Sequence, residues 1–434
     1  MHAHDSHRNR HWRLPRDLTN ALAACLCAGA MLSITPARAQ SVDLVDVLVR
    51  MFIPGPSINV EERSPQREFR FRAKGPVTFT EAEDDIERLE GRVSIEEKRA
   101  GRTRRIDFRP AGATGVKRIY KVDGREQPLD AEGRRWVAEM IGSTMRELPL
   151  DTARRVRRLH ASGGAAAVLS EIELIHSDHA RRDYSEHLTK LGPLDEKSLD
   201  RFIAAVSRIH SDFELRSALL VVINTQRLPP AQLASVLNSV AKMQSAFEQR
   251  SVLEALAPKL GTETTEPIVA SAWQSAIGMI RSDFEVRTIL EGMARRDALS
   301  PAQAEMILVA TRKIESDFER ATVLKAMVKH LAQSGESSRA EFFRSTNKIG
   351  SDFERRGVLT ALIESGDLDR NTYFPLFDSI GAIQSSHEKH VVLLATAKQM
   401  PRDPELVARY REIARRLGDH ERGQAENALE RLKL

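Results

Sequence analysis

Ser211-Asp212-Phe213-Glu214 is the stretch that decides the fold, because it recurs along the chain. Identical copies begin at Ser282, Ser316 and Ser351, and degenerate copies begin at Ser177, Ser245, Ser385 and Gly418. The first residues of successive copies lie 34, 34, 37, 34, 35, 34 and 33 positions apart. A period of this kind predicts a repeat architecture in which each copy belongs to one supersecondary unit.

The tetrapeptide predicts the start of a helix. Serine followed three residues later by glutamate is a capping box: the hydroxyl accepts from the glutamate amide, and the carboxylate accepts from the serine amide. Aspartate in the first turn suits the positive end of the helix dipole, and an arginine four residues later, as in Asp212 and Arg216, predicts an ion pair within the helix. The predicted structural caps are Ser211, Glu214, Ser245, Glu248, Ser282, Glu285, Ser316, Glu319, Ser351 and Glu354.

The residues around each tetrapeptide predict a helical hairpin. Ile or Met two residues before the serine, a small residue six before it and a large apolar residue nine before it form one stripe of a preceding helix. After the cap, apolar pairs such as Ile289-Leu290 and Val323-Leu324 predict the buried stripe of a second helix. One such hairpin cannot bury its own apolar face, but a stack of hairpins can. Residues 166–434 are therefore predicted to form an α-solenoid.

A different pattern precedes the repeats. In residues 63–128 short runs alternate apolar and charged residues, which predicts a small antiparallel β domain of about five strands. Turn signals separate the runs, and Asp123-Gly124 is typical of a two-residue hairpin turn. Asp130 then predicts the cap of a helix, and residues 129–165 are expected to hold connecting helices. The predicted fold class is α+β.

Residues 1–39 have the features of a secretory signal peptide. A basic stretch ending at Arg16 precedes an apolar run and the small-residue site Ala37-Arg38-Ala39, which predicts cleavage before Gln40 and a periplasmic or secreted protein. There are two alternatives: Cys25 fits the acylated cysteine of a bacterial lipoprotein, or the apolar run stays as an uncleaved anchor. Residues 40–62 are predicted to be an apolar segment followed by a Pro/Gly linker.

The predicted mature chain is nearly neutral and has no cysteine. The full chain has a formal net charge of +5, and residues 1–39 hold five arginines against two aspartates, which leaves +2. This balance gives little electrostatic reason to expect nucleic acid as a partner. Both cysteines, Cys25 and Cys27, precede the predicted cleavage site, so the mature chain would have no disulfide and no thiolate site.

The repeat also resembles a known family. Its length matches tetratricopeptide arrays, but their signature positions are missing. The pattern Ile-x-Ser-Asp-Phe-Glu-x-Arg-x-x-Leu instead resembles the HEAT-like repeats attached to bacterial M56-type (antirepressor) membrane metallopeptidases. The β segment, with Gly91-Arg92-Val93-Ser94-Ile95, is similar to what precedes such repeats, and the resemblance covers most of residues 65–425. The peptidase module has no counterpart here, because the chain has no His-Glu-x-x-His motif, so no catalytic role carries over.

Two groups of histidines are the candidates for metal chemistry. In His387-Glu388-Lys389-His390 the histidines stand at i,i+3 rather than at the i,i+4 spacing of a zinc helix, and Glu388 is already interpreted as a cap residue. His176, His179 and His187 lie in the first, degenerate repeat, where an exposed structural role is the simpler interpretation. We therefore assign no catalytic, metal-binding or cofactor-binding residue and expect no cofactor.

Three functions fit these patterns. The first is a non-enzymatic module that binds a protein or peptide partner of the cell envelope on the solenoid surface. The second, implied by the resemblance, is a sensor accessory to a membrane peptidase. The third is an enzyme with a site between the β domain and the first repeats. A membrane would be reached only through an uncleaved signal or lipidation at Cys25.

Overall fold

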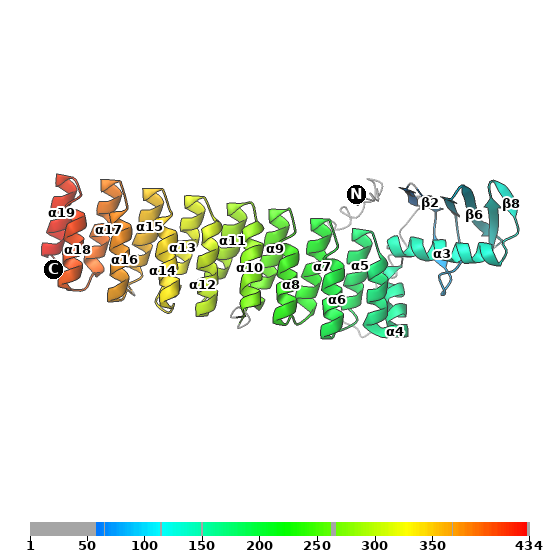
Figure 1. Ribbon diagram of the computed structural model, residues 1–434, viewed down its shortest axis with the longest axis horizontal. Helices are drawn as coiled ribbons and strands as arrows, with labels where there is room; N and C mark the ends of the chain where they lie inside the picture. The colour runs from blue at the N-terminus through cyan, green and yellow to red at the C-terminus, as the bar shows by residue number, and fades with distance from the viewer. Residues whose placement is uncertain are drawn as a thin grey trace, which may run out of the picture. The chain divides into compact units, whose positions relative to one another are not determined.

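The computed structural model describes residues 58–431, apart from residues 65, 113–114, 149–150, 262–265 and 367. The predicted signal peptide and the apolar stretch that follows it lie outside the described residues. The described residues form two compact units. The first ends at Thr152 and includes Ile175–Ala180, and the second holds Ala153–Leu174 and the chain from Arg181 onward. The fold is α+β, as predicted, with an antiparallel sheet in the first unit and helical repeats in the second (Figure 1).

The first unit is built on a six-stranded antiparallel sheet. Successive side chains of a strand point to opposite faces, so alternating apolar and charged residues place one set in the core. The strand order is β1-β2-β5-β6-β7-β8, and β3 pairs with β4 in a separate two-stranded sheet. The strands are β1 (Ile58–Ser64), β2 (Arg67–Lys74), β3 (Val77–Phe79), β4 (Ile86–Leu89), β5 (Arg92–Arg99), β6 (Arg102–Ala111), β7 (Gly115–Val122) and β8 (Arg125–Gln127).

Two-residue turns set the register of this meander. Asp123 and Gly124 join β7 to β8 with φ angles of 49° and 82°, and Ala100 and Gly101 join β5 to β6 with φ angles of 50° and 80°. Positive φ at both central residues defines the turn whose twist matches that of the flanking strands. The hairpin predicted at Asp123-Gly124 is confirmed.

The first unit has more strands than the sequence indicated. About five were predicted, and eight are described. The first strand begins at Ile58, inside the stretch expected to be a linker, β4 was not predicted, and of β8 only the hairpin turn that leads into it was predicted. All three residues of β8 are exposed, and β4 is apolar only at its two ends. Short strands with so few buried residues show no period of two, so the sequence pattern does not reveal them.

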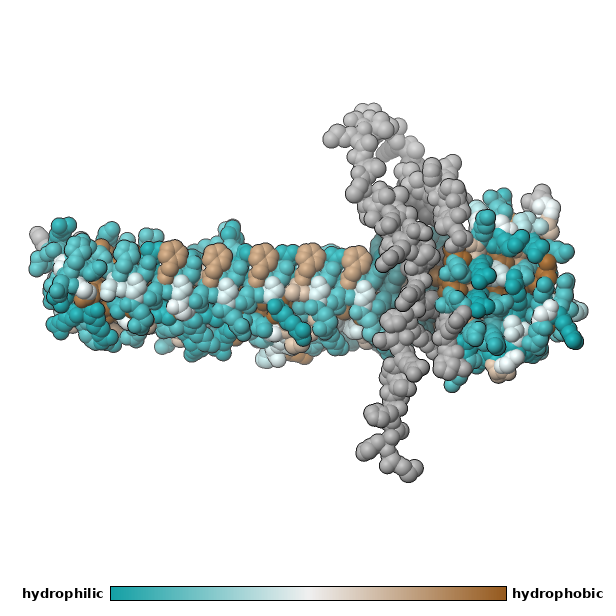
Figure 2. Space-filling model, turned by 90° about the horizontal axis from the view of Figure 1, so that it is seen from above, coloured by the Kyte–Doolittle hydropathy of each residue, from teal (hydrophilic) through white to brown (hydrophobic). Residues whose placement is uncertain are grey.

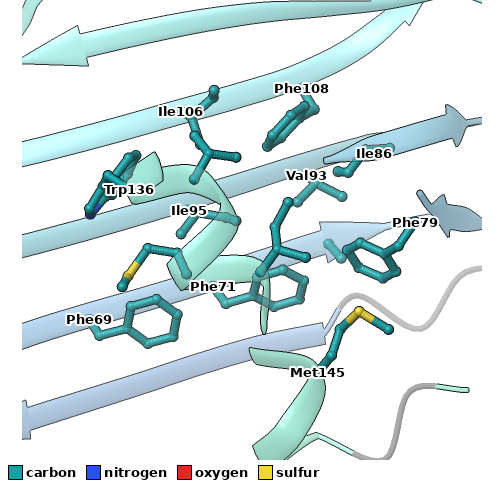
Figure 3. Close-up of a cluster of buried hydrophobic side chains, with 14 of the residues drawn as sticks. Phe69, Phe71, Phe79, Ile86, Val93, Ile95, Ile106, Phe108, Trp136 and Met145 are labelled. Atoms are coloured by element: carbon teal, nitrogen blue, oxygen red, sulfur yellow. The ribbon is translucent and has the colours of Figure 1, made fainter. Parts of the chain in front are cut away.

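One helix, α3 (Ala131–Glu147), covers the core face of the sheet. It begins at Asp130, whose side chain accepts a hydrogen bond from the amide of Gly133, as predicted. Trp136 and Met145 of this helix lie over the apolar side chains of the central strands (Figure 3). The indole Nε1 of Trp136 donates a 2.8 Å hydrogen bond to the buried carboxylate of Glu97, so the polar atom of this large side chain is satisfied inside the core.

The second unit is an array of paired helices, as the repeat predicted. In each pair a first helix leads through a tight turn into a second helix, which begins at the repeated tetrapeptide and is here named the motif helix. The motif helices are α5 (Asp178–Thr189), α7 (Asp212–Thr225), α9 (Ala246–Leu256), α11 (Asp283–Ala294), α13 (Asp317–Leu331), α15 (Asp352–Glu364), α17 (Ser386–Gln399) and α19 (Asp419–Arg431). The first helices are α4 (Thr152–Leu174, with non-helical Gly163 and Gly164), α6 (Glu196–Val206), α8 (Pro230–Val240), α10 (Pro267–Met279), α12 (Pro301–Ala310), α14 (Glu336–Asn347), α16 (Arg370–Gly381) and α18 (Pro404–Ala414).

Successive pairs stack in two layers (Figure 1). From α7 to α19 each motif helix contacts the next motif helix, and from α6 to α18 each first helix contacts the next first helix. The stripes predicted from the sequence are the buried ones. The small residues six positions before the serine are buried at Ala205, Ser239, Ala276, Ala310, Ser345 and Ser379, and the large ones nine positions before it are buried at Phe202, Val236, Trp273, Ile307, Phe342 and Leu376. The hairpins therefore bury their apolar faces against one another.

Candidate functional site

The phenylalanine of each tetrapeptide lies on the surface of the array. Phe213, Phe247, Phe284, Phe318 and Phe353 are 56%, 50%, 51%, 59% and 58% exposed, although each of their helices buries other apolar side chains. Figure 2 shows hydrophobic side chains evenly spaced in a row along one face of an otherwise hydrophilic array. We name these five residues the phenylalanine ladder.

The position of each ring follows from helix geometry. Phe213 precedes the buried Leu215 by two residues, and at 3.6 residues per turn these two side chains point about 200° apart. Four residues after each ring stands a small residue, so that side of the ring has no large neighbour on the same helix. These small residues are Ser217, Ser251, Thr288, Thr322 and Gly357.

An arginine lies against most of the rings. The guanidinium carbon of Arg216 is 4.9 Å from the ring centre of Phe213, and the same contact measures 5.1 Å for Arg250, 4.7 Å for Arg287 and 4.6 Å for Arg356. A cation over an aromatic face at an exposed site contributes about 0.5–1 kcal/mol. The contact helps to hold the arginine in place and leaves much of the ring exposed to solvent.

The same arginines form ion pairs between one repeat and the next. The Nε atoms of Arg216, Arg250, Arg287 and Arg356 lie 2.8, 2.9, 2.7 and 3.0 Å from a carboxylate oxygen of the glutamate in the following tetrapeptide. The partners are Glu248, Glu285, Glu319 and Glu388. A hydrogen bond to Glu291, with a further one to Glu319, raises the pKa of Arg287, so its guanidinium stays charged. Charge pairing at this surface therefore includes a regular set of ion pairs between repeats.

The predicted capping box is only half correct. The serine is the N-cap, and its hydroxyl accepts from the amide of the glutamate at Ser211, Ser245, Ser282, Ser316 and Ser351. The predicted bond from the carboxylate back to the cap is wrong, because Glu214, Glu248, Glu285, Glu319 and Glu354 pair with Arg182, Arg216, Arg250, Arg287 and Lys325 of the preceding repeat.

The aspartate also acts between repeats. Oδ2 of Asp283 accepts hydrogen bonds from the amides of Glu315 and Ser316 at 2.8 and 2.7 Å, and Asp212 and Asp352 bind the amides of the next turn in the same way. The predicted pair of Asp212 with Arg216 is therefore replaced: the aspartate binds the next turn, and the arginine binds the next glutamate. The serine, aspartate, glutamate and arginine all have structural roles.

In two copies the phenylalanine is retained although a neighbouring position differs from the identical copies. Ala246 stands where other copies have aspartate, and Phe247 is still present and exposed. Ala321 stands where other copies have the stacking arginine, and Phe318 is still present, with the largest exposed fraction of the five. A role in positioning the arginine therefore does not explain why the phenylalanine is present. No role was predicted for these phenylalanines from the sequence, although their offset of two residues from the buried stripe was a usable signal.

Four of the candidate histidines have simple structural surroundings, with a nearby carboxylate, exposure to solvent or burial. Nδ1 of His176 is 2.9 Å from the carboxylate of Glu147, and Nε2 of His187 is 3.9 Å from Asp183. His387 is exposed, and burial lowers the pKa of His390. Within the described part of the chain, no three His, Cys, Asp or Glu side chains are grouped so that they could hold a metal ion.

The chain was compared with known proteins. No family model matches it, and no curated protein matches it. Among the helices that the structure describes, none combines the length and the apolarity that a membrane crossing needs.

Proposed function

We propose that this protein is a non-enzymatic interaction module that binds a protein or peptide partner along the phenylalanine ladder. The observation that supports the proposal is the row of five half-exposed rings at one position of successive motif helices, with no role in the core. A single exposed apolar residue is ordinary, but five at the same position of successive helices form a regular row, and a concentration of exposed apolar side chains is typical of an interaction site.

The ladder has suitable properties for such a role. Aromatic side chains bury about 150–250 Å² each, so five half-exposed rings offer on the order of 500 Å². Each ring stands in the first turn of a helix whose cap serine and glutamate are hydrogen-bonded or ion-paired to neighbouring groups, as at Ser282 and Glu319. Little side-chain freedom is lost when a partner binds rings held in this way, which favours affinity.

We further propose that the protein acts outside the cytoplasm, in the cell envelope, after cleavage before Gln40. The support is the sequence of residues 1–39, with its basic stretch, apolar run and small-residue site. Fractionation of cells followed by N-terminal sequencing tests this proposal. A mature chain that starts at Gln40 in the periplasm is expected, and an intact N-terminus in the cytoplasm would contradict it.

The binding proposal is tested by a matched pair of variants. In the ladder variant, Phe213, Phe247, Phe284, Phe318 and Phe353 are all changed to serine. The control variant carries Leu191→Ser and Ile268→Ser, which remove exposed apolar side chains (39% and 55% exposed) near the loops between hairpins. Circular dichroism and thermal melting establish that both variants fold.

Cross-linked capture from the envelope fraction is then compared for the three proteins. A partner that the wild-type chain and the control capture, and that the ladder variant loses, supports the proposal. A partner retained equally by the folded ladder variant would refute it.

A further inference from the structure

We propose that the phenylalanine ladder takes a proline-rich segment in the polyproline II conformation, which runs along the array across successive motif helices. This inference rests on the proposed function and specifies the chemistry of the partner. It is argued from the spacing of the rings, the state of the backbone beneath them, the pairing of the charges and the width of the apolar strip.

The spacing of the rings matches the repeat of a polyproline II helix. The five rings occupy the same position on α7, α9, α11, α13 and α15, which contact one another in sequence, and packed helices lie about 8–10 Å apart. A polyproline II helix has three residues per turn and a rise of 3.1 Å, so one face repeats about every 9 Å. An extended β-strand repeats the same face about every 7 Å and loses register with the rings.

The backbone beneath the rings is helical and has no strand edge. The ladder stands on α-helices and not on a sheet, and the hydroxyls of Ser217, Ser251, Thr288 and Thr322 donate to the carbonyls of the ladder phenylalanines. Such a surface offers no strand edge to which an incoming strand could bond. A polyproline II segment has no internal backbone hydrogen bonds, and aromatic surfaces recognise it through side-chain packing.

The carboxylates beside the rings are ion-paired or hydrogen-bonded. Beside the rings, Glu248, Glu285, Glu319 and Glu388 are ion-paired with arginine, and Asp212, Asp283 and Asp352 accept from backbone amides. The glutamate charges are therefore balanced by arginine, and the aspartates, which stay negatively charged, are bound to backbone amides, so these charges do not favour an acidic segment and the rings supply the apolar contact. Arg216, Arg250 and Arg356 engage glutamate through Nε and are 21–25% exposed, so these guanidinium groups have further N–H donors for peptide carbonyls.

The apolar strip formed by the rings is narrow and small in area. On each motif helix the apolar surface is one ring wide, between a small hydroxyl or glycine position and an arginine or alanine. An amphipathic helix needs a broad apolar groove, which this strip lacks. Two copies of the chain facing each other would need about 800 Å² from each, more than the roughly 500 Å² that the rings offer.

The probe is a fluorescent 15-residue oligoproline, titrated with the purified full chain and followed by anisotropy. Four intervals of about 9 Å match roughly 12 residues of polyproline II, so affinity should rise from 6 to 9 to 15 residues and then level off at 21. The comparison peptides have equal length: a Gly/Ser peptide, and a helix-forming peptide with leucine at every seventh position.

The wild-type chain and the Leu191→Ser, Ile268→Ser control are expected to bind the oligoproline at least tenfold more tightly than the Gly/Ser peptide. The folded ladder variant should lose this difference, and Phe284→Ser alone should weaken binding severalfold. Oligoproline binding no tighter than Gly/Ser binding would overturn the inference, as would tighter binding of the helical peptide.

The envelope capture experiment separates the two failures. If ladder-dependent capture persists while oligoproline fails, the proposed function stands and only the polyproline chemistry is wrong. If capture is independent of the ladder, the proposed function falls, and this inference falls with it.

Discussion

Asp283 offers the sharpest test of how the repeats hold together. Its Oδ2 accepts from the amides of Glu315 and Ser316, the two residues that lead into α13 of the next repeat. Hydrogen bonds to a charged group contribute about 1.5–3 kcal/mol each, but water reaches this turn and recovers part of the loss. We expect Asp283→Ala to lower the free energy of unfolding by about 2 kcal/mol, and Asp283→Asn, which keeps an acceptor, by about 1 kcal/mol.

Hydrogen exchange measured by mass spectrometry places the effect along the chain. In a repeat array stability is approximately a sum of repeat terms and nearest-neighbour terms, so the loss should be local. Peptides from α12 and α13 should exchange faster in Asp283→Ala, whereas peptides from α17 and α19 should be unchanged. Urea midpoints give the overall change in stability.

The chain also offers a reciprocal control. Ala246 occupies the aspartate position of its repeat, so the amides of the next turn lack the acceptor that Asp283 supplies elsewhere. Ala246→Asp should stabilise the array by about 1 kcal/mol and slow exchange in α11. Unchanged exchange in both Asp283→Ala and Ala246→Asp would refute the view that these aspartates link the repeats.

Three further predictions concern single sites. Glu97→Ala leaves the indole N–H of the buried Trp136 without its acceptor, and we expect a loss of about 2–3 kcal/mol in the urea-derived free energy of unfolding; an unchanged midpoint would contradict the pairing. Gly91→Ala would place a Cβ 1.7 Å from the carbonyl oxygen of Lys74, so the first unit should lose its cooperative thermal transition, and a wild-type transition would disprove that close approach. Burial lowers the pKa of His390 below 6.5, so the unfolded chain takes up a proton that the folded chain excludes, and stability should fall as the pH drops below about 6.5. The urea midpoint of His390→Gln should therefore change less between pH 7.5 and 5.5 than that of the wild type, and an equal change would exclude His390 as a source.

The sequence alone determined the repeat, the hairpin and the buried stripes. Capping by Ser282 and burial of Trp273 or Leu290 depend on residues within one hairpin, and helix periodicity makes such local patterns readable. The same periodicity places Phe284 two residues before the buried Val286, on the solvent side of its helix. The β8 strand was indicated only by the turn before it, because all of its side chains are exposed.

Only the tertiary structure decided the partners of the charged groups. Within one repeat, Asp283 and Arg287 can form an i,i+4 pair, and Ser282 and Glu285 can form a capping box, so local rules predict both. Stacking brings Ser316 and Glu319 of the next repeat to 2.7 Å from these groups, and each carboxylate or guanidinium then binds across the interface. A local pattern does not contain the offset between neighbouring repeats. Because of that offset, the charged groups of each tetrapeptide bond to the neighbouring repeat, and its phenylalanine ring remains exposed to solvent.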